Sequence, residues 1–352
     1  MCKALFVLIL AAILLSGCFS PVGPDAPAGG SPTAVETPPV PIKPSVSAAP
    51  PESVIRPESI DKVKRLYTLS GHTKRVTDVA FSPDGAYLAS SGYDRKIRVW
   101  DTHSWQEVHT FDINKSDLNV IAFSPDGQRL ASAETIWDVE SGQAVLQLTY
   151  TGEVGHVAFS PDGSMLALAG FPAQITLLDS ASGQLIRTFE PEAGVLGYFS
   201  VVFSPDGKTL AAGSAQYGTV TLWDVESGKI TAMLKHGDQS DVHDIAFSPD
   251  GRLLAGGGTG SAVRIWDVSS GEEFQRLWLN NGIYGLTFSP DGKILALASC
   301  SRVAQLWDIE TGSTLRNLPH ADELMAVAFS PDGSLLATGG YDNTVVVWGI
   351  PR

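Results

Sequence analysis

Short apolar runs, each closed by a tight turn, recur along most of this chain. Val79–Phe81 runs into the string Ser82-Pro-Asp-Gly85, which suits a type I turn, and a second apolar run follows at Tyr87–Ala89. The next run, Ile97–Trp100, alternates with a period of two, which is typical of a half-buried strand. The pattern therefore predicts short antiparallel strands joined by turns.

This unit occurs seven times. The string Phe-Ser-Pro-Asp-Gly begins at Phe81, Phe123, Phe159, Phe203, Phe247, Phe288 and Phe329. Each copy is followed by Trp-Asp or its remnant, at Trp100, Trp137, Leu178, Trp223, Trp266, Trp307 and Trp348. A period of about 40 residues indicates a repeat architecture, and four short strands per repeat make one propeller blade. We therefore expect residues 63–352 to form an all-β, seven-bladed β-propeller of four-stranded antiparallel blades.

The ring must be closed by strands from both ends of the repeat region. Only four residues follow Trp348, too few for a fourth strand in the last blade. Lys64–Ser70 has strand character and precedes the first repeat. We expect this N-terminal strand to complete the last blade, which would remove the open edges of the sheet.

These registered motifs resemble the WD-repeat family over about residues 64–352. The resemblance implies a buried structural tetrad of His, Ser or Thr, Asp and Trp in two blades. The matching residues are His72, Ser90, Asp94 and Trp100 in the first blade, and His320, Thr338, Asp342 and Trp348 in the last. In middle blades Tyr217, Gly260 and Ser301 stand in the place of the Asp, so we expect apolar packing to replace the polar network there.

The N-terminal residues have a different character. Residues 4–15 are an apolar run too short to span a bilayer, and residues 1–17 read as a secretory signal peptide. Leu15-Ser-Gly-Cys18 resembles the lipobox of bacterial lipoproteins, which implies cleavage before Cys18 and lipidation of its thiol. An ordinary signal peptide is the alternative. In that family Asp after the Cys retains the protein at the inner membrane, so Phe19 allows outer-membrane delivery; otherwise we expect the outer face of the cytoplasmic membrane.

A proline-rich segment separates the motif from the repeats. Residues 19–62 hold 11 of the 22 prolines, with Ala, Ser, Gly and Thr between them. Such a composition cannot bury a core. We expect residues 18–62 to form a disordered tether that starts at the lipidated Cys18.

The net charge of −14 limits the classes of partner. The chain has no basic cluster, so it is a poor candidate for binding a nucleic-acid backbone. Anionic lipid surfaces are disfavoured for the same reason, and we expect acyl chains to provide any membrane attachment. We expect the propeller itself to be a monomer.

Catalytic motifs are lacking. The sequence contains no Gly-x-Ser-x-Gly elbow, no phosphate-binding Gly-x-x-x-x-Gly-Lys loop and no paired histidines at metal-ligand spacing. His156, His236 and His243 offer a metal site only if neighbouring blades bring them together, and we expect packing or surface roles for them instead. We therefore predict no catalytic residue, metal or cofactor.

Binding is expected on the loops that differ among the repeats. The turns that carry the repeat motifs hardly vary, whereas the connections at the opposite end vary in length and chemistry, and loops on a rigid scaffold commonly carry binding residues. The predicted contact set is Arg75, Asp78, Tyr93, Tyr198, Asp241, Asp244, Tyr284, Glu323 and Tyr341. These residues predict a non-catalytic protein-binding platform in the bacterial envelope. An assembly factor analogous to the propeller lipoprotein of outer-membrane β-barrel assembly is the alternative, and a propeller enzyme is a third reading.

The second repeat is shorter than the others. Phe123 and Trp137 are 14 residues apart, whereas the other six repeats take 19 or 20. The missing residues fall between Ser132 and Ile136, which predicts shortened middle strands and a notch beside the loops of Arg75 and Asp117. The notch is either a neutral deletion or a docking site for a partner.

Overall fold

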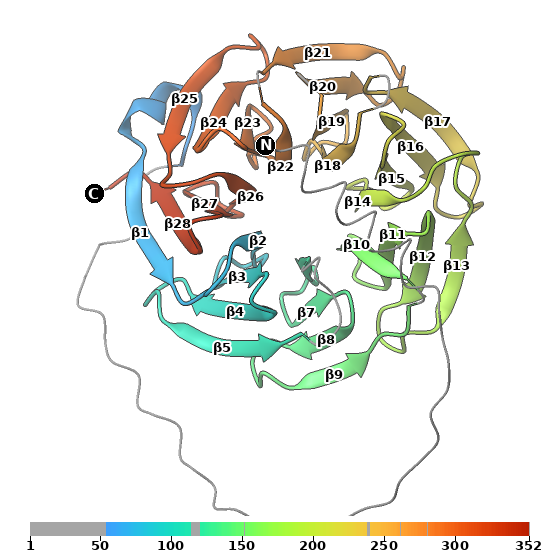
Figure 1. Ribbon diagram of the computed structural model, residues 1–352, viewed down its shortest axis with the longest axis horizontal. Helices are drawn as coiled ribbons and strands as arrows, with labels where there is room; N and C mark the ends of the chain where they lie inside the picture. Colours follow the sequence, from blue (N-terminus) through green and yellow to red (C-terminus); the bar gives the residue numbers. More distant parts are fainter. Residues whose placement is uncertain are drawn as a thin grey trace, which may run out of the picture. The chain divides into compact units, whose positions relative to one another are not determined.

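The computed structural model describes residues 54–113, 120–150, 152–237, 240–260, 262–279 and 281–351. Seven antiparallel sheets of four strands each are arranged in a ring, and the strand that leads into each Ser-Pro-Asp-Gly turn lies nearest the centre of the ring (Figure 1). The predicted fold class is confirmed. The signal peptide, Cys18 and the first part of the tether lie outside the described residues, as does Asp117.

The strands of a blade follow one another outward in chain order, except in the last blade. Blade 1 contains β2 (Val76–Phe81), β3 (Tyr87–Gly92), β4 (Lys96–Asp101) and β5 (Glu107–Asp112). Blade 2 contains β6 (Ile121–Phe123), β7 (Arg129–Ser132), β8 (Thr135–Asp138) and β9 (Ala144–Gln147). Blade 3 contains β10 (Glu153–Phe159), β11 (Met165–Phe171), β12 (Gln174–Asp179) and β13 (Leu185–Phe189).

The remaining blades repeat this plan. Blade 4 contains β14 (Tyr198–Phe203), β15 (Thr209–Ser214), β16 (Thr219–Asp224) and β17 (Ile230–Lys235). Blade 5 contains β18 (Val242–Phe247), β19 (Leu253–Gly258), β20 (Ala262–Asp267) and β21 (Glu273–Trp278). Blade 6 contains β22 (Ile283–Phe288), β23 (Ile294–Ser299), β24 (Val303–Asp308) and β25 (Thr314–Pro319). Blade 7 contains β26 (Leu324–Phe329), β27 (Leu335–Gly340), β28 (Thr344–Gly349) and, from the N-terminal side, β1 (Lys64–Ser70).

The closing strand pairs as the sequence predicts. β1 runs antiparallel to β28, with Leu69 opposite Val345 and Thr68 opposite Val346. This pairing converts an open row of blades into a ring, so β28 has no unpaired edge. Closure by the N-terminal strand is confirmed.

The repeated Ser-Pro-Asp-Gly turns explain the uniform hairpins between the first two strands. In blade 1 the Ser82 hydroxyl accepts the N–H of Tyr87 over 2.9 Å and donates to the Asp84 carboxylate over 2.6 Å. Gly85 has a φ of 72°, which a residue with a side chain rarely adopts. Each motif thus satisfies its own polar groups and fixes one end of the blade.

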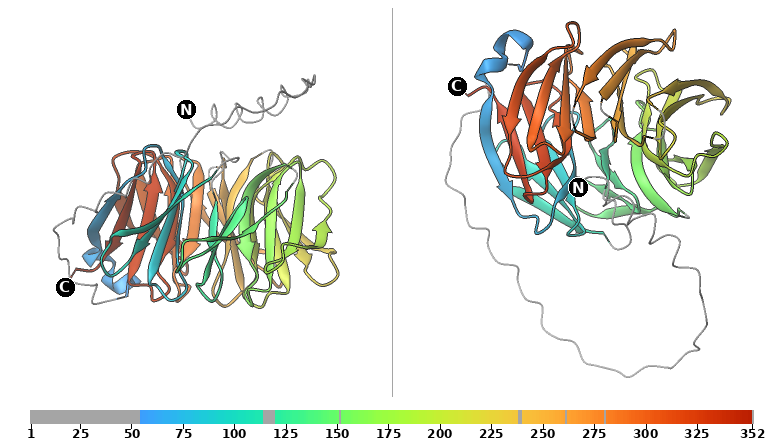
Figure 2. Two further views of the ribbon diagram at one scale, coloured as in Figure 1. Left: turned by 90° about the horizontal axis from the view of Figure 1, so that it is seen from below. Right: turned by 45° about the horizontal axis from the view of Figure 1, so that its top comes forward.

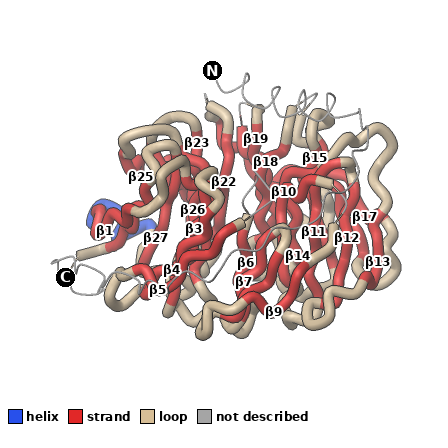
Figure 3. Tube along the Cα trace, turned by 60° about the horizontal axis from the view of Figure 1, so that its bottom comes forward, coloured by secondary structure: helices blue, strands red, loops and turns tan. Residues whose placement is uncertain are grey.

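The propeller begins earlier than expected. Pro57–Lys62 forms a 3₁₀ helix, η1, which lies beside β1 (Figure 3). Ile55 is fully buried and Ile60 nearly so, in one cluster with Leu318. The prediction of a disordered tether is therefore wrong for residues 54–62. The proline-rich composition gave no indication that two isoleucines are buried against blades 6 and 7. We call residues 54–62 the clasp.

A β-bulge recurs at one position of the inner strand in six blades. The pairing register with the second strand shifts at the residue four positions before the Phe of the motif. The inserted residues are Thr77, Gly155, Phe199, His243, Tyr284 and Met325. A bulge re-aims the side chains beside it, so six blades direct equivalent residues in the same way.

The residue after the bulge connects neighbouring blades where it is an aspartate. Asp78 of β2 accepts the backbone N–H of Ile121 in β6 over 3.0 Å. Asp244 of β18 accepts that of Leu286 in β22 over 2.7 Å. Desolvation raises the pKa of Asp78 to about 7 and that of Asp244 to about 8. Both carboxyl groups are therefore structural links between blades.

Blade 2 forms with shortened strands. β7 and β8 have four residues each, against six in most blades, and Ala133 and Glu134 alone connect them. The predicted shortening of the middle strands is confirmed. Whether the deletion provides a docking notch stays a prediction.

We predict that the clasp stabilises the ring. Replacing the fully buried Ile55 with Ala should lower the free energy of unfolding by about 2–4 kcal/mol, because a cavity forms between blades 6 and 7. Ile230→Ala is the matched control, since 43% of Ile230 is exposed, and should change it by roughly 0.5 kcal/mol or less. Guanidinium unfolding measures both, and equal midpoints for the two variants would show that the clasp does not contribute.

We also predict a loss of stability between about pH 4 and pH 8. The folded pKa values of Asp78 and Asp244 lie above the unfolded value of 3.8, so the folded chain binds more protons in this window. The free energy of unfolding should therefore decrease as the pH rises. Asp244→Asn should flatten this slope in urea unfolding at pH 5 and pH 8, whereas Asp241→Asn should not, because the pKa of Asp241 is lowered. An unchanged slope in Asp244→Asn would contradict the assignment.

Candidate functional site

The variable face of the propeller is the end opposite the repeated turns. Because the strands are antiparallel, the β2–β3 and β4–β5 turns share one end, and the β3–β4 and β5–β6 connections share the other. The side view shows the strands running between these two ends (Figure 2). Arg75 precedes β2, Tyr93 follows β3 and Tyr341 follows β27, so all three lie at the variable face.

Five of the predicted contact residues come together there. Arg75 is half-buried, and its guanidinium carbon lies 3.6 Å from the ring centroid of Tyr93 and 4.8 Å from that of Tyr341. Its Nη1 donates to the Tyr341 hydroxyl over 3.0 Å. Tyr284 and Glu323 lie near enough to interact electrostatically with Tyr341. We call these five residues, from blades 6, 7 and 1, the Arg75 cluster.

Two tyrosine hydroxyls of the cluster, those of Tyr284 and Tyr341, remain protonated. Burial raises the pKa of Tyr284 to about 12, and the neighbouring Tyr341 and Glu323 add to this increase. Burial also raises the pKa of Tyr341, although Arg75 acts in the opposite direction. The cluster therefore presents protonated hydroxyls beside one guanidinium.

An aromatic arc extends from this cluster over the inner strands of blades 6, 5 and 4. The rings of His243 and Tyr284 stack with centroids 5.3 Å apart, and Phe199 meets His243 edge-on at 5.2 Å. All three are the bulge residues of their blades, and Phe171 contacts Phe199 at 5.2 Å. Sequence reasoning missed Phe171, Phe199 and this role of His243. Comparing the position four residues before each motif would have found two of them.

Three of the nine predicted contact residues are placed differently from the prediction. Tyr198 is fully buried and packs edge-on against Trp223, because it opens β14 and faces the interior. The carboxylates of Asp78 and Asp244 accept backbone N–H groups between blades instead of projecting from loops. The prediction of surface contacts is wrong for these residues. Asp241 lies at the variable face, where it accepts the N–H of Gln216 over 2.8 Å.

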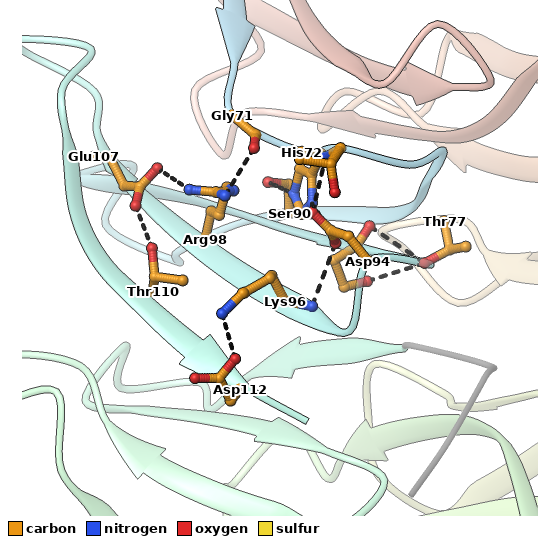
Figure 4. Close-up of polar contacts among 12 residues, drawn as sticks. Gly71, His72, Thr77, Ser90, Asp94, Lys96, Arg98, Glu107, Thr110 and Asp112 are labelled. Atoms are coloured by element: carbon orange, nitrogen blue, oxygen red, sulfur yellow. Dashed lines mark hydrogen bonds and ion pairs between the residues drawn. The ribbon is translucent and has the colours of Figure 1, made fainter. Parts of the chain in front are cut away.

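The tetrad residues of the first blade form a hydrogen-bonded chain, of which Figure 4 shows His72, Ser90 and Asp94. Trp100 Nε1 donates to the Ser90 hydroxyl over 3.0 Å, and this oxygen lies 2.9 Å from His72 Nε2. His72 Nδ1 lies 2.9 Å from the Asp94 carboxylate. Burial lowers the pKa of His72, so its ring is neutral and accepts from Ser90 while donating to Asp94.

This tetrad connects the two loops that hold the Arg75 cluster in blade 1. Asp94 also accepts the backbone N–H of Thr73 over 3.0 Å. Thr73 and Arg75 share one loop, and Asp94 directly follows Tyr93 in the other. The tetrad therefore fixes the position of Arg75 relative to the ring of Tyr93.

In the last blade the tetrad is looser. His320 Nε2 lies 2.7 Å from the Thr338 hydroxyl, which also accepts from Trp348 Nε1 over 2.8 Å. His320 Nδ1 and the Asp342 carboxylate are 3.5 Å apart, and Asp342 accepts the N–H of Thr344 over 3.1 Å. Asp342 directly follows Tyr341, so this tetrad stands beside the other ring that holds Arg75.

Of the three histidines considered for a metal site, His236 and His243 are buried and His156 is partly buried. His236 takes the tetrad position in blade 5, and its Nε2 lies 3.0 Å from the carbonyl of Gly256, which stands where the two tetrads have Ser90 and Thr338. Burial lowers the pKa of His156 to about 4. Within the described ranges no group of three or more His, Cys, Asp or Glu side chains has an arrangement suited to a metal ion. In the same ranges no helix has the length and apolar character to cross a bilayer.

Curated relatives match short parts of the chain. A stretch of 84 residues is 33% identical to small ribosomal subunit protein RACK1z of Arabidopsis thaliana and covers 23% of this chain and 26% of that protein. A stretch of 52 residues is 38% identical to ribosome assembly protein 4 of Saccharomyces cerevisiae, covering 15% and 10%. An uncharacterized WD repeat-containing protein of Synechocystis is 49% identical over 51 residues, covering 14% of this chain and 15% of that protein. The chain thus spans about a quarter or less of the length of these relatives.

The family model for the WD domain, G-beta repeat, matches six stretches. They are residues 63–101, 105–138, 183–224, 228–267, 276–308 and 312–349. Residues 139–182 lie outside these stretches and include Leu178, which replaces the Trp of the motif. Each stretch runs from the outer strand of one blade into the three inner strands of the next. Since the six stretches together cover more than half of the sequence, the chain belongs to the WD-repeat family.

Proposed function

We propose that this protein is a non-catalytic scaffold that binds other proteins through the variable face of its propeller. The observation that carries the proposal is the Arg75 cluster, which continues into an aromatic arc across adjacent blades. Arginine and tyrosine are among the residues that contribute most to binding at protein interfaces. Rigid aromatic side chains also lose little conformational entropy on binding.

The rigidity of the ring supports this function. Hydrogen-bonded tetrads stand directly beside Tyr93 and Tyr341, so the binding surface is organised before a partner arrives. Preorganisation reduces the entropic cost of association. Two of the relatives are by name a ribosomal subunit protein and a ribosome assembly protein, which agrees with a role in assemblies.

We further propose that lipid attached to Cys18 anchors the scaffold in a bacterial cell envelope. This rests on the lipobox-like Leu15-Ser-Gly-Cys18 after an apolar run, and Phe19 allows delivery to an outer membrane. The clasp shortens the expected tether to residues 18–53. An anchor of this kind would hold the propeller at the membrane while leaving it free to meet partners.

Photo-crosslinking distinguishes the two ends of the propeller. Benzoylphenylalanine at Tyr284, in the Arg75 cluster, should form specific crosslinked products in cells that express the chain. The same residue at the exposed Lys208, beside a repeated turn at the opposite end, should form few. Equal products at both positions, or products at Lys208 alone, would contradict binding through the variable face.

Cys18→Ala tests the anchor. The variant should lose membrane association in detergent partitioning, because acyl chains on the thiol would provide most of the attachment. Ser16→Ala is a suitable control, since it changes the same motif and keeps the thiol. Equal partitioning of wild type and Cys18→Ala would remove the lipoprotein proposal and leave the scaffold proposal intact.

A further inference from the structure

We infer that the Arg75 cluster binds a peptide segment of the partner through an aspartate or glutamate side chain. This inference rests on the proposed function and names the chemistry of the partner. The deciding feature is an arginine that is half-buried, held between two aromatic rings, and without an acidic partner in the part of the chain that the structure describes.

Other arginines of the propeller illustrate what Arg75 lacks. Arg264 donates to the Glu273 carboxylate over 2.8 Å, and Arg98 pairs with Glu107. Arg187 donates to the Ser227 carbonyl over 2.8 Å. The acceptor of Arg75 is the phenol oxygen of Tyr341, which is a weaker partner for a guanidinium than a carboxylate.

One donor of the Arg75 guanidinium is left unsatisfied within the described part of the chain. Arg75 Nε is buried, and no hydrogen-bond acceptor faces it among the described residues. The Tyr341 hydroxyl, which accepts from Arg75, keeps its own proton and can donate it. A buried donor without an acceptor costs free energy, and a ligand carboxylate would satisfy it. The planar guanidinium fork also matches the two oxygens of a carboxylate.

The charges around Arg75 are favourable for an anion, although the whole protein is acidic. Lys74 is exposed on the loop of blade 1 that carries Arg75. The acidic side chains nearby are largely engaged: Asp94 with His72, Asp342 with Thr344, and Asp322 with Arg302 over 3.2 Å. Glu323 is the exception, because no hydrogen bond or ion pair of its carboxylate is found among the described residues. It is the group with which a ligand carboxylate must compete.

Apolar groups on the same face suggest the neighbours of the acidic residue. Leu196 and Tyr217, in variable-face loops at the ends of β14 and β15, are 48% and 47% exposed. The aromatic arc leads from Tyr284 towards this region through His243 and Phe199. We therefore infer an extended segment that combines an acidic residue for Arg75 with apolar residues for the arc.

A defined peptide probe tests the inference. Random 12-residue peptides, displayed on phage without a free C-terminus, are selected on the purified full chain in detergent. The selected peptides should share an Asp or Glu. In fluorescence anisotropy, changing that residue to Asn or Gln should weaken binding about tenfold or more, because a charge-assisted hydrogen bond is lost.

Protein variants identify the site and the sign of the charge. Arg75→Gln should weaken binding of the selected peptide about as much as changing the acidic residue of the peptide to Asn or Gln. Combining the protein change with the peptide change should weaken binding little further. Glu323→Gln should strengthen binding because a competing negative charge is removed. Lys74→Gln removes an exposed charge next to Arg75 and serves as the control, with an expected change of about threefold or less. Arg75→Lys, which keeps the charge and loses the planar fork, replaces Arg75→Gln if the latter does not fold.

The outcomes separate the inference from the proposed function. Two outcomes would overturn the acidic-residue inference and leave binding at the variable face. One is a set of selected peptides that share Lys or Arg. The other is a peptide whose binding is weakened by Tyr284→Ala and unchanged by Arg75→Gln. A peptide affected by neither Tyr284→Ala nor Arg75→Gln would overturn both. A selection that yields no binder would overturn the inference, and the crosslinking from Tyr284 would then decide the proposed function alone.

Discussion

Closure of the ring is the constraint on which the rest of the structure depends. A four-stranded blade is too small to bury both of its faces, and each apolar cluster of this propeller contains residues of two neighbouring blades. Phe111 of blade 1 stacks on Trp137 of blade 2 with centroids 5.0 Å apart, for example. No blade therefore has a core of its own. The pairing of β1 with β28 completes the last sheet, and the clasp covers it with Ile55 and Ile60.

The same periodicity that builds the core also builds the candidate site. The inner-strand bulge recurs at one position, and in blades 4, 5 and 6 this position holds a residue with a ring. Phe199, His243 and Tyr284 are therefore in ring-to-ring contact. One residue further on, the same strands use Asp244 to bond the next blade. Adjacent positions of one repeat thus form the candidate site and connect neighbouring blades.

The features that recur in each repeat were predictable from the sequence, whereas the features that depend on contacts with neighbouring blades were not. Seven copies of two motifs define the ring, and the strand before the first copy defines its closure. Tyr198 resembled a loop tyrosine, but it is buried because β14 begins with it. The role of Asp78 depends on the N–H of Ile121, which is 43 residues away, and no local pattern reveals such a partner. Ile55 was missed because its burial depends on a distant blade, while its proline-rich surroundings are typical of a tether.

Besides stabilising the fold, the two tetrads keep the rings of Tyr93 and Tyr341 in position beside Arg75. They stand in the two blades whose loops carry Tyr93 and Tyr341, and in both cases the tetrad aspartate is the next residue in the chain. In blade 4 the aspartate position is taken by Tyr217, which is 47% exposed. Hydrogen-bonded tetrads are thus found where two rings must be held on either side of one guanidinium. Since cation–π contact weakens when the rings move away from the cation, retaining the tetrads in blades 1 and 7 preserves the geometry of Arg75.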